Sequence, residues 1–225
     1  MPNVSSLKYP KKSHRKNVTL PAHSVRLAEF FGIMMGDGGI NNSWQANISL
    51  NSIKDAQYSR YILVLCNKIF GFVPAIHKRK DSNTLILSLA STSVVDFLVA
   101  NGLSRGNKLK NGLKIPKWIL EKPSYCKACV RGLIDTDGCM FVHTHRIKGK
   151  IYKNIGLTFT SYAPELIFQV AEILEKFSIL PHINKQGQAI YLYQADSVLR
   201  YLKVFGTSNH RIESVYKKWR DARVV

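Results

Sequence analysis

The fold is decided by two related stretches of sequence, FFGIMMGDG at residues 30–38 and VRGLIDTDG at residues 130–138. When the sequence is shifted by 100 positions, five of the fifteen residues from 24 to 38 are identical. The repeat keeps the glycines Gly32 and Gly132 and the acids Asp37 and Asp137. Because matching residues at one offset indicate an internal duplication, we interpret the chain as two copies of one structural unit.

The two stretches are followed by the same order of patterns at drifting offsets. Each precedes a β-like run, at 47–50 in the first copy and 155–159 in the second, and then a helical pattern, at 56–69 and 166–177. Two short strands and a closing helix complete each copy, at 75–78, 85–89 and 93–100, and at 182–185, 190–193 and 197–205. This order predicts an α+β fold made of two αββαββα units.

Breaks in the pattern divide the chain into four parts. We expect residues 1–23 to form a basic N-terminal arm and residues 24–107 to form the first half. Residues 108–117, where Gly and Pro interrupt the periodicity, are predicted to link it to the second half at 118–225.

The composition excludes several classes of protein. The chain has 225 residues, with 33 Lys and Arg against 14 Asp and Glu, a formal net charge of +19. Its 45% of hydrophobic residues excludes wholesale disorder, and its four cysteines are too few for a disulfide scaffold. No apolar run predicts a membrane span or a secretion signal.

The excess positive charge indicates a polyanionic partner. Nucleic acid is preferred over an anionic membrane surface because the sequence contains no strongly amphipathic basic helix. We expect an intracellular, reducing compartment that contains DNA, such as a cytoplasm or an organelle.

Small residues recur along the predicted helix of each motif. Ser24 and Ser124 are the expected N-caps, and the small residues then follow four apart, as Ala28, Gly32 and Gly36 in one helix and Ala128, Gly132 and Thr136 in the other. Small side chains let two helix backbones approach closely, so we expect the two helices to pack together about a pseudo-twofold axis. Their C-terminal ends, with Asp37 and Asp137, would then converge.

Two converging carboxylates at the negative ends of two helix dipoles need a cation to offset them. Carboxylate and backbone carbonyl oxygens suit Mg²⁺ or Ca²⁺, which makes Asp37, Asp137 and the carbonyls of Gly36 and Thr136 the candidate metal ligands. A divalent ion on a basic protein fits metal-assisted hydrolysis of a phosphodiester. The alternative is that both Asp-Gly pairs only form turns after helices, but duplication at matched register favours the metal site.

These two motifs, together with the repeat order from about Ser24 onward, resemble a single-chain LAGLIDADG homing endonuclease. The second motif is close to the family pattern, and the first has Met35 where the family often has its earlier acid. The resemblance implies a monomer whose two antiparallel sheets form a saddle over double-stranded DNA. It implies an intron-encoded enzyme that cleaves both strands of a long asymmetric site with Mg²⁺ and leaves short 3′ overhangs, with Ca²⁺ supporting binding without cleavage.

The resemblance also implies polar or basic residues that position water and neutralise phosphate near the metal. By their order along the chain we assign this role to Ser52 and Ser161, to Lys108, and to His210, with Arg211 as the alternative to His210. Helix N-caps for the serines and ordinary surface charge for the others are equally open interpretations.

Side chains that can contact bases or phosphates are concentrated in the predicted strands and their turns. Alternate residues of a β-ribbon can contact base edges in the major groove of DNA. In the first half the predicted contacts are Asn42, Trp44, Gln45, Asn47, Ser49, His77, Arg79 and Lys80. In the second half they are His143, His145, Arg146, Lys148, Lys150, Lys153, Asn184, Lys185, Gln186, Gln188, Tyr191 and Tyr193.

The same sequence offers two other interpretations. Cys126, Cys129, Cys139, His143 and His145 include zinc-ligand types, but the first two fall on a predicted helix and the histidines on a strand, so a zinc site is disfavoured. The second hypothesis for function is a protein that binds DNA or RNA without cleaving it, such as a maturase with intron RNA as partner. Retention of both motif acids favours the endonuclease.

Overall fold

The computed structural model describes residues 18–222 and contains the predicted duplication. The first half consists of α1 (Val25–Met35), β1 (Gly38–Gly39), β2 (Gln45–Asn51), α2 (Ala56–Phe70), β3 (Ala75–Lys78), β4 (Thr84–Ala90) and α3 (Thr92–Ala100). The second half consists of α5 (Pro123–Asp137), β5 (Gly138–Ile147), β6 (Lys150–Thr160), α6 (Pro164–Lys176), β7 (His182–Ile183), β8 (Ala189–Leu192) and α7 (Ala195–Val204). A short α4 (Lys117–Leu120) precedes the second half, and α8 (His210–Asp221) follows it. The predicted α+β fold of two αββαββα units is therefore confirmed.

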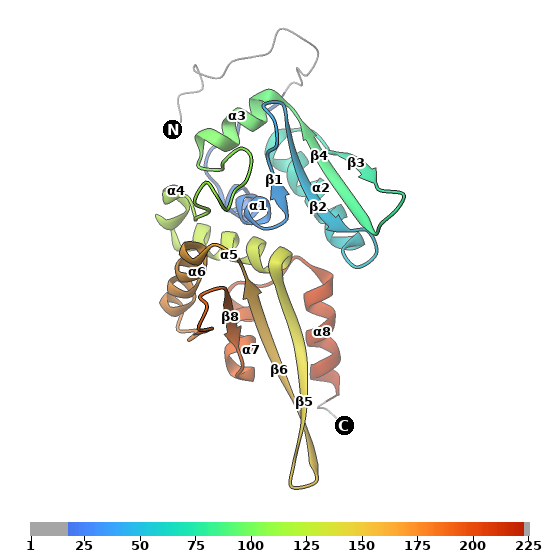
Figure 1. Cartoon of the computed structure of the whole chain (residues 1–225), viewed down its shortest axis with the longest axis vertical. Helices are drawn as coiled ribbons and strands as arrows, with labels where there is room; N and C mark the ends of the chain where they lie inside the picture. Colours follow the sequence, from blue (N-terminus) through green and yellow to red (C-terminus); the bar gives the residue numbers. More distant parts are fainter. Residues whose placement is uncertain (1–17, 223–225) are drawn as a thin grey trace.

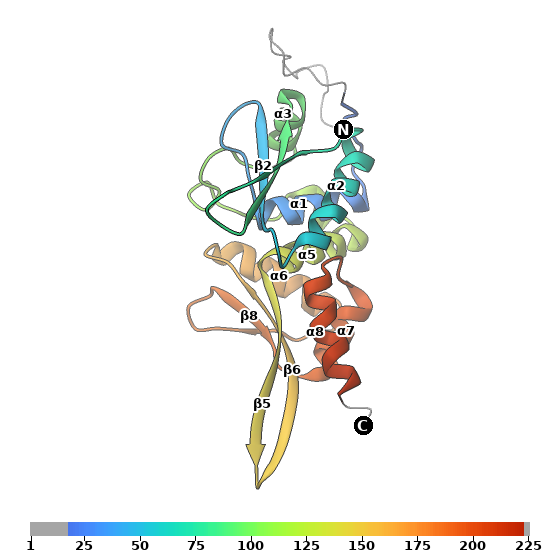
Figure 2. The same cartoon turned by 90° about the vertical axis from the view of Figure 1, so that its right-hand side faces the viewer.

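Each half contains one four-stranded antiparallel sheet with the same strand order. The order is β1-β2-β4-β3 in the first half and β5-β6-β8-β7 in the second. The halves meet at α1 and α5 in the middle of the molecule (Figure 1). In the side view the strands lie on one side, and α2, α7 and α8 lie on the other (Figure 2). One face of each sheet is therefore covered by helices, and the other is open.

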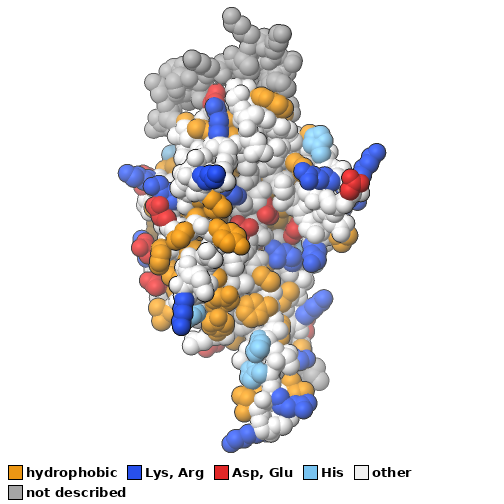
Figure 3. Space-filling model, viewed as in Figure 1, with side chains coloured by type: hydrophobic (Ala, Val, Ile, Leu, Met, Phe, Trp, Pro, Cys, Tyr) orange, Lys and Arg blue, Asp and Glu red, His pale blue; other side chains and the backbone are white. Residues whose placement is uncertain are grey.

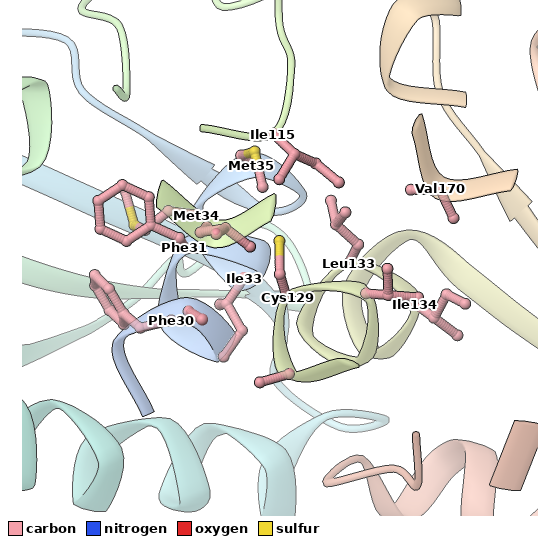
Figure 4. Close-up of a cluster of buried hydrophobic side chains, with 14 of the residues drawn as sticks. Phe30, Phe31, Ile33, Met34, Met35, Ile115, Cys129, Leu133, Ile134 and Val170 are labelled. Atoms are coloured by element: carbon pink, nitrogen blue, oxygen red, sulfur yellow. The ribbon is translucent and has the colours of Figure 1, made fainter. Parts of the chain in front are cut away.

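The two motif helices pack through their glycines, as predicted. A Cβ on Gly32 would overlap the carbonyl oxygen of Cys129, and a Cβ on Gly132 would overlap the carbonyl oxygen of Glu29. Buried apolar side chains from both helices surround this contact, among them Phe30, Ile33, Leu133 and Ile134 (Figure 4). Close backbone approach brings the C-terminal ends of α1 and α5 side by side.

The starts of the two motif helices differ. The Ser24 side chain caps α1 by accepting a hydrogen bond from the amide of Leu27 at 3.2 Å. The predicted cap at Ser124 is wrong, because the N-cap position is taken by Lys122 and α5 begins at Pro123, two residues before the start that a Ser124 cap predicts. Proline suits the first helical position, since its ring presets the helical φ and its missing amide hydrogen would have no partner there.

The first hairpin of each half differs in length. β1 has two residues, whereas β5 and β6 form a long hairpin that projects from the second half (Figure 1). Its tip is the pair Lys148-Gly149, with φ of 48° and 80°. Positive φ at both central residues is typical of a type I′ turn, whose twist matches that of the strands.

The ends of the chain also depart from the sequence analysis. Residues 1–17 of the predicted arm lie outside the described residues, and residues 18–23 pack on the first half, where Thr19 donates a backbone hydrogen bond to Phe70. Helix α8 lies beyond the two predicted repeat units and packs on β5 and β6. The indole of its Trp219 donates to the carbonyl of Lys153 at 2.9 Å. Within residues 18–222, no helix is long and apolar enough to cross a membrane.

Candidate active site

Asp37 and Asp137 lie where the two motif helices end. α5 ends at Asp137, and α1 ends at Met35 with Gly36 as its C-cap. A Cβ placed on Gly36 would lie 3.2 Å from Oδ2 of Asp137, so the carboxylate of the second motif lies against the backbone of the first. The structure therefore brings together the two acids that the sequence analysis selected.

Both carboxylates are held in an environment that opposes their ionisation. Burial, followed by the charges of Asp137 and Asp55, raises the pKa of Asp37 to about 7, although Lys108 and Arg211 act in the opposite direction. Asp137 is open to solvent on one side, but the protein around the rest of its side chain still raises its pKa, and Lys108 opposes that shift. Groups of this kind, placed together, are typical of functional sites and of cation sites.

Two basic residues occupy equivalent places at the two helix ends. The Lys108 ammonium donates to the carbonyl of Gly36 and, at 3.0 Å, to that of Gly38. Arg211 donates from Nη1 to the carbonyl of Gly138 at 3.2 Å and from Nη2 to that of Thr136 at 3.5 Å. Each cation thus meets the negative end of one motif helix.

Arg211 also joins the two halves, because its Nε lies 3.4 Å from Oδ1 of Asp55 on the first half. His210, the preferred choice of the sequence analysis, is placed elsewhere: its side chain is about half exposed and its Nδ1 lies 3.6 Å from Glu213. The alternative, Arg211, is therefore the residue that the structure brings to the site.

The two serines occupy equivalent positions after β2 and β6. The amide of Ser52 donates to the carbonyl of Asn83 at 2.8 Å, and the amide of Ser161 donates to that of Gln188 at 2.9 Å. Neither is a helix N-cap, since those positions are taken by Asp55 and Ala163. The Ser52 hydroxyl is buried and has no hydrogen-bond partner among the described residues, and Ser161 lines a groove of about 530 Å³ with Lys108 and Asp137.

The oxygen atoms at the helix ends fit a hard divalent cation. The site offers two carboxylates and the carbonyls of Gly36 and Thr136, which are the donors that Mg²⁺ and Ca²⁺ accept. Across residues 18–222, no group of three or more His, Cys, Asp or Glu side chains is placed to hold a metal ion, so carbonyl oxygens and water would have to complete the coordination. Cys126 and Cys129 are buried, and Cys139 is exposed.

The strand register decides which predicted contact residues share the open face. On β2, Ala46, Ile48 and Leu50 are buried, so Gln45, Asn47 and Ser49 lie on the opposite, open face. Pairing of β3 with β4 places His77 on the same face. In the second half the open face carries His143, His145, Lys150 and Tyr191, whereas Arg146 and Lys153 have the opposite parity.

The remaining predicted contacts lie at turns or strand ends. Asn42 and Trp44 precede β2, Arg79 and Lys80 follow β3, Lys148 is at the tip of the long hairpin, Asn184, Lys185, Gln186 and Gln188 connect β7 to β8, and Tyr193 follows β8. The rings of Tyr191 and Tyr193 stack 5.1 Å apart. Figure 3 shows the open face, with acidic side chains near its middle and basic side chains and histidines around them and along the hairpin.

Sequence reasoning missed two residues of the site, Asp55 and Asn209. The side-chain amide of Asn209 donates to Oδ1 of Asp55 at 3.2 Å, so the two residues meet across the halves next to Arg211. The position of Asp55 just before α2 could have been recognised from the sequence, because Asp is a common N-cap residue. No pattern in the sequence indicates that Asn209 lies near it.

The duplicated αββαββα fold matches that of LAGLIDADG homing endonucleases of known structure. Residues 124–216 match the protein-family model described as LAGLIDADG-like domain. No curated protein matches the chain in sequence.

Several solved structures of that class have the same fold. The I-LtrWI LAGLIDADG homing endonuclease bound to target DNA aligns with a TM-score of 0.55 and 12% identity, over 88% of this chain and 89% of that one. I-SmaMI bound to an uncleaved DNA target in the presence of calcium ions aligns with a TM-score of 0.58 and 9% identity, over 89% of this chain and 90% of that one. A variant of I-DmoI, in complex with its target DNA nicked in the coding strand and with manganese present, aligns with a TM-score of 0.53 and 13% identity. The alignment covers 81% of this chain and 95% of that one.

Proposed function

We propose that the protein is a site-specific endonuclease that binds a long, asymmetric double-stranded DNA target as a monomer and hydrolyses both strands with Mg²⁺. One observation carries the proposal: Asp37 and Asp137, each with a raised pKa, meet at the ends of the motif helices between Lys108 and Arg211. The chain has only 14 acidic residues and a net charge of +19, and desolvation opposes the ionisation of these two. A bound cation would explain why two acids lie together at such a place.

The residues of the site have distinct roles in this proposal. Asp37 and Asp137, with the carbonyls of Gly36 and Thr136, would hold the divalent ion. When bound, such an ion polarises the phosphate and lowers the pKa of a bound water. Lys108 and Arg211 would neutralise the charge that develops on the phosphate of each strand. Because their cationic groups are anchored to the ends of the two motif helices, each is held in place before DNA arrives.

The polar hydroxyls beside the helix ends complete the proposed site. Ser161 opens into the groove that contains Asp137, so its hydroxyl can orient a water molecule there. The Ser52 hydroxyl is its counterpart in the first half, where it is buried without a partner among residues 18–222. A hydroxyl in such a place can bond to ordered water, as buried polar groups generally do.

The DNA surface in this proposal is the open face of the two sheets. Amide side chains such as Asn47 and Gln45 can pair with base edges, and the lysines of the long hairpin can contact phosphates. Two related sites placed across the pseudo-twofold axis suit a duplex, in which the two scissile phosphates are also related by an approximate twofold. Cleavage that leaves short 3′ overhangs and an intracellular compartment with DNA both belong to the proposal.

The test is to incubate the purified protein with a plasmid library that carries a randomised site, once with Mg²⁺ and once with Ca²⁺, and to sequence the linearised ends. We expect discrete ends that share one long motif with Mg²⁺, and bound but uncut DNA with Ca²⁺. Ends without a shared motif, or binding without cleavage in both ions, would contradict the proposal. The latter result would support the non-cleaving binder and direct attention to intron RNA.

Variants of the two acids provide the matched control. Asp37→Asn and Asp137→Asn should each abolish double-strand cleavage while DNA affinity stays close to that of the wild type. Asp196→Asn, which removes an exposed acid from the first turn of α7, should cut as the wild type does. Equal cutting by all three variants would remove Asp37 and Asp137 from the mechanism.

A further inference from the structure

A short segment between α7 and α8 is tied to the interior of the molecule by its polar groups. We call residues 205–209 the strap. The Thr207 hydroxyl donates to Oδ1 of Asp135 at 2.5 Å, and the Ser208 amide donates to Oδ2 of the same carboxylate at 2.7 Å. The Asn209 side chain donates to the Asp135 carbonyl at 2.8 Å. Asp135 is fully buried on α5, so the strap is attached to a motif helix below the surface.

The same strap reaches the other motif helix. The Ser208 hydroxyl donates to Oε1 of Glu29 at 2.8 Å, and Glu29 is buried on α1 in the first half. Its second oxygen pairs with the guanidinium of Arg131, which also donates to the Phe205 carbonyl at 3.3 Å. Phe205 and Ser208 thus connect the strap to one ion pair, Glu29 with Arg131, which spans the two halves.

The strap leads directly into the residue that presents a cation to the site. Asn209 is the N-cap of α8, and its side chain accepts a hydrogen bond from the Arg211 amide at 2.9 Å. Arg211 is the second residue of the helix after that cap, and its guanidinium contacts Gly138 and Asp55. A shift of the strap would therefore move Arg211 relative to the helix end that it contacts.

Among the described residues, the first half contains no segment equivalent to the strap. At the positions 100 residues before Arg131 and Asp135, the motif of the first half has the apolar residues Phe31 and Met35. Lys108 is instead carried by the loop after α3, in which the amide of Gly106 donates to the carbonyl of Ile40 at 2.7 Å. Only one of the two proposed catalytic cations is thus placed by the buried polar residues.

We infer that Ser208 and Glu29 are positioning residues that hold the strap and thereby fix the Arg211 guanidinium, so that loosening the strap impairs cleavage of one DNA strand and spares the other. The inference rests on the proposed endonuclease activity for its strand selectivity. Neither residue lies in the candidate site itself, since Glu29 is 2% exposed and Ser208 bonds to it from the strap.

The first experiment follows the two strands separately, on the selected target labelled with a different dye on each strand. Ser208→Ala should slow one strand about tenfold, the size typical of removing a group that orients a residue of a metal site, and nicked DNA should accumulate. Arg211→Met should slow the same strand, and Ser208→Thr should restore it. Ser59→Ala is the matched control, because the hydroxyl of this buried serine donates to the Ala56 carbonyl of its own helix and not to the strap.

Equal slowing of both strands by Ser208→Ala would show a general structural role and overturn the inference, as would wild-type rates on both strands.

A second readout does not need cleavage. The Arg211 Nε hydrogen, which faces Asp55, should exchange with solvent about tenfold faster in Ser208→Ala than in the wild type or Ser59→Ala, as measured by NMR. Unchanged exchange would overturn the inference even if the protein cuts no DNA, a result that by itself would contradict only the proposed function.

Discussion

Replacing Asp37 by Asn should stabilise the protein at neutral and alkaline pH when no divalent ion is present. Burial and the neighbouring charges of Asp137 and Asp55 raise the pKa of Asp37 from 3.8 to about 7. Between these values the folded protein binds the proton more tightly than the unfolded chain, so the free energy of unfolding falls as the pH rises through that interval. At about 1.36 kcal/mol for each pKa unit, a shift of about three units has an upper limit of about 4 kcal/mol.

The expected gain is smaller than this limit. The Asp37 side chain is only half-buried and keeps part of its hydration, and an Asn amide in the same place also needs hydrogen bonds. We expect Asp37→Asn to raise the free energy of unfolding by about 2 kcal/mol at about pH 8. At about pH 5 the folded protein keeps this proton while the unfolded chain has mostly lost it, so the difference should fall to less than half of its value at about pH 8. It should vanish only below about pH 4, where the carboxyl is protonated in both states.

The assay is urea unfolding at both pH values, in EDTA and again with Mg²⁺. Asp135 has a pKa of about 7 because of its burial, but it is present in both proteins and cancels in their difference. Mg²⁺ should stabilise the wild type and reduce the gap, since an ion that binds only the folded state stabilises it. Asp196→Asn should match the wild type throughout. A variant that is less stable at about pH 8, or equally stabilised at both pH values, would refute the reasoning.

Three further substitutions test other parts of the structure. Gly132→Ala should lower the free energy of unfolding by about 2 kcal/mol in urea unfolding, because its Cβ would overlap the backbone at Glu29; a neutral effect would show that the motif helices can separate freely. Arg131→Met should cost about 3 kcal/mol in the same assay, since it leaves the buried Glu29 carboxylate without its cation, and Arg131→Met combined with Glu29→Gln should recover part of that loss. Lys108→Met should slow cleavage about a hundredfold in single-turnover assays with little change in DNA affinity; an unchanged rate would exclude Lys108 from the chemistry.

The fold could be predicted because its main signals are local and occur twice. Gly32 and Gly132 have no side chain, so their spacing alone indicates a close helix contact, and the Asp-Gly pairs mark the helix ends. The order of strands and helices after each motif then follows from periodicity. The N-cap of α5 was misplaced by two residues because two good helix-start residues, Pro123 and Ser124, are adjacent.

The site was predictable only in part. The two acids lie at matched positions in the repeat, whereas the choice between His210 and Arg211 depends on how α8 is rotated against α5, and neighbouring residues of a helix point about 100° apart. The strap could not be predicted, because Glu29 and Asp135 meet Ser208 through contacts between residues far apart in the sequence. Such pairings leave no periodic signal in a single chain.

The unequal hairpins have a consequence for how much DNA each half could cover. At about 3.3 Å per residue, the ten residues of β5 span about 33 Å, close to one helical turn of B-DNA, whereas β1 spans about 7 Å. On a duplex bound to the open face, the protected segment would therefore extend further from the cut on the side of the second half. A nuclease footprint would be lopsided, and the positions at which sequence changes are tolerated would be distributed unevenly about the point of cleavage.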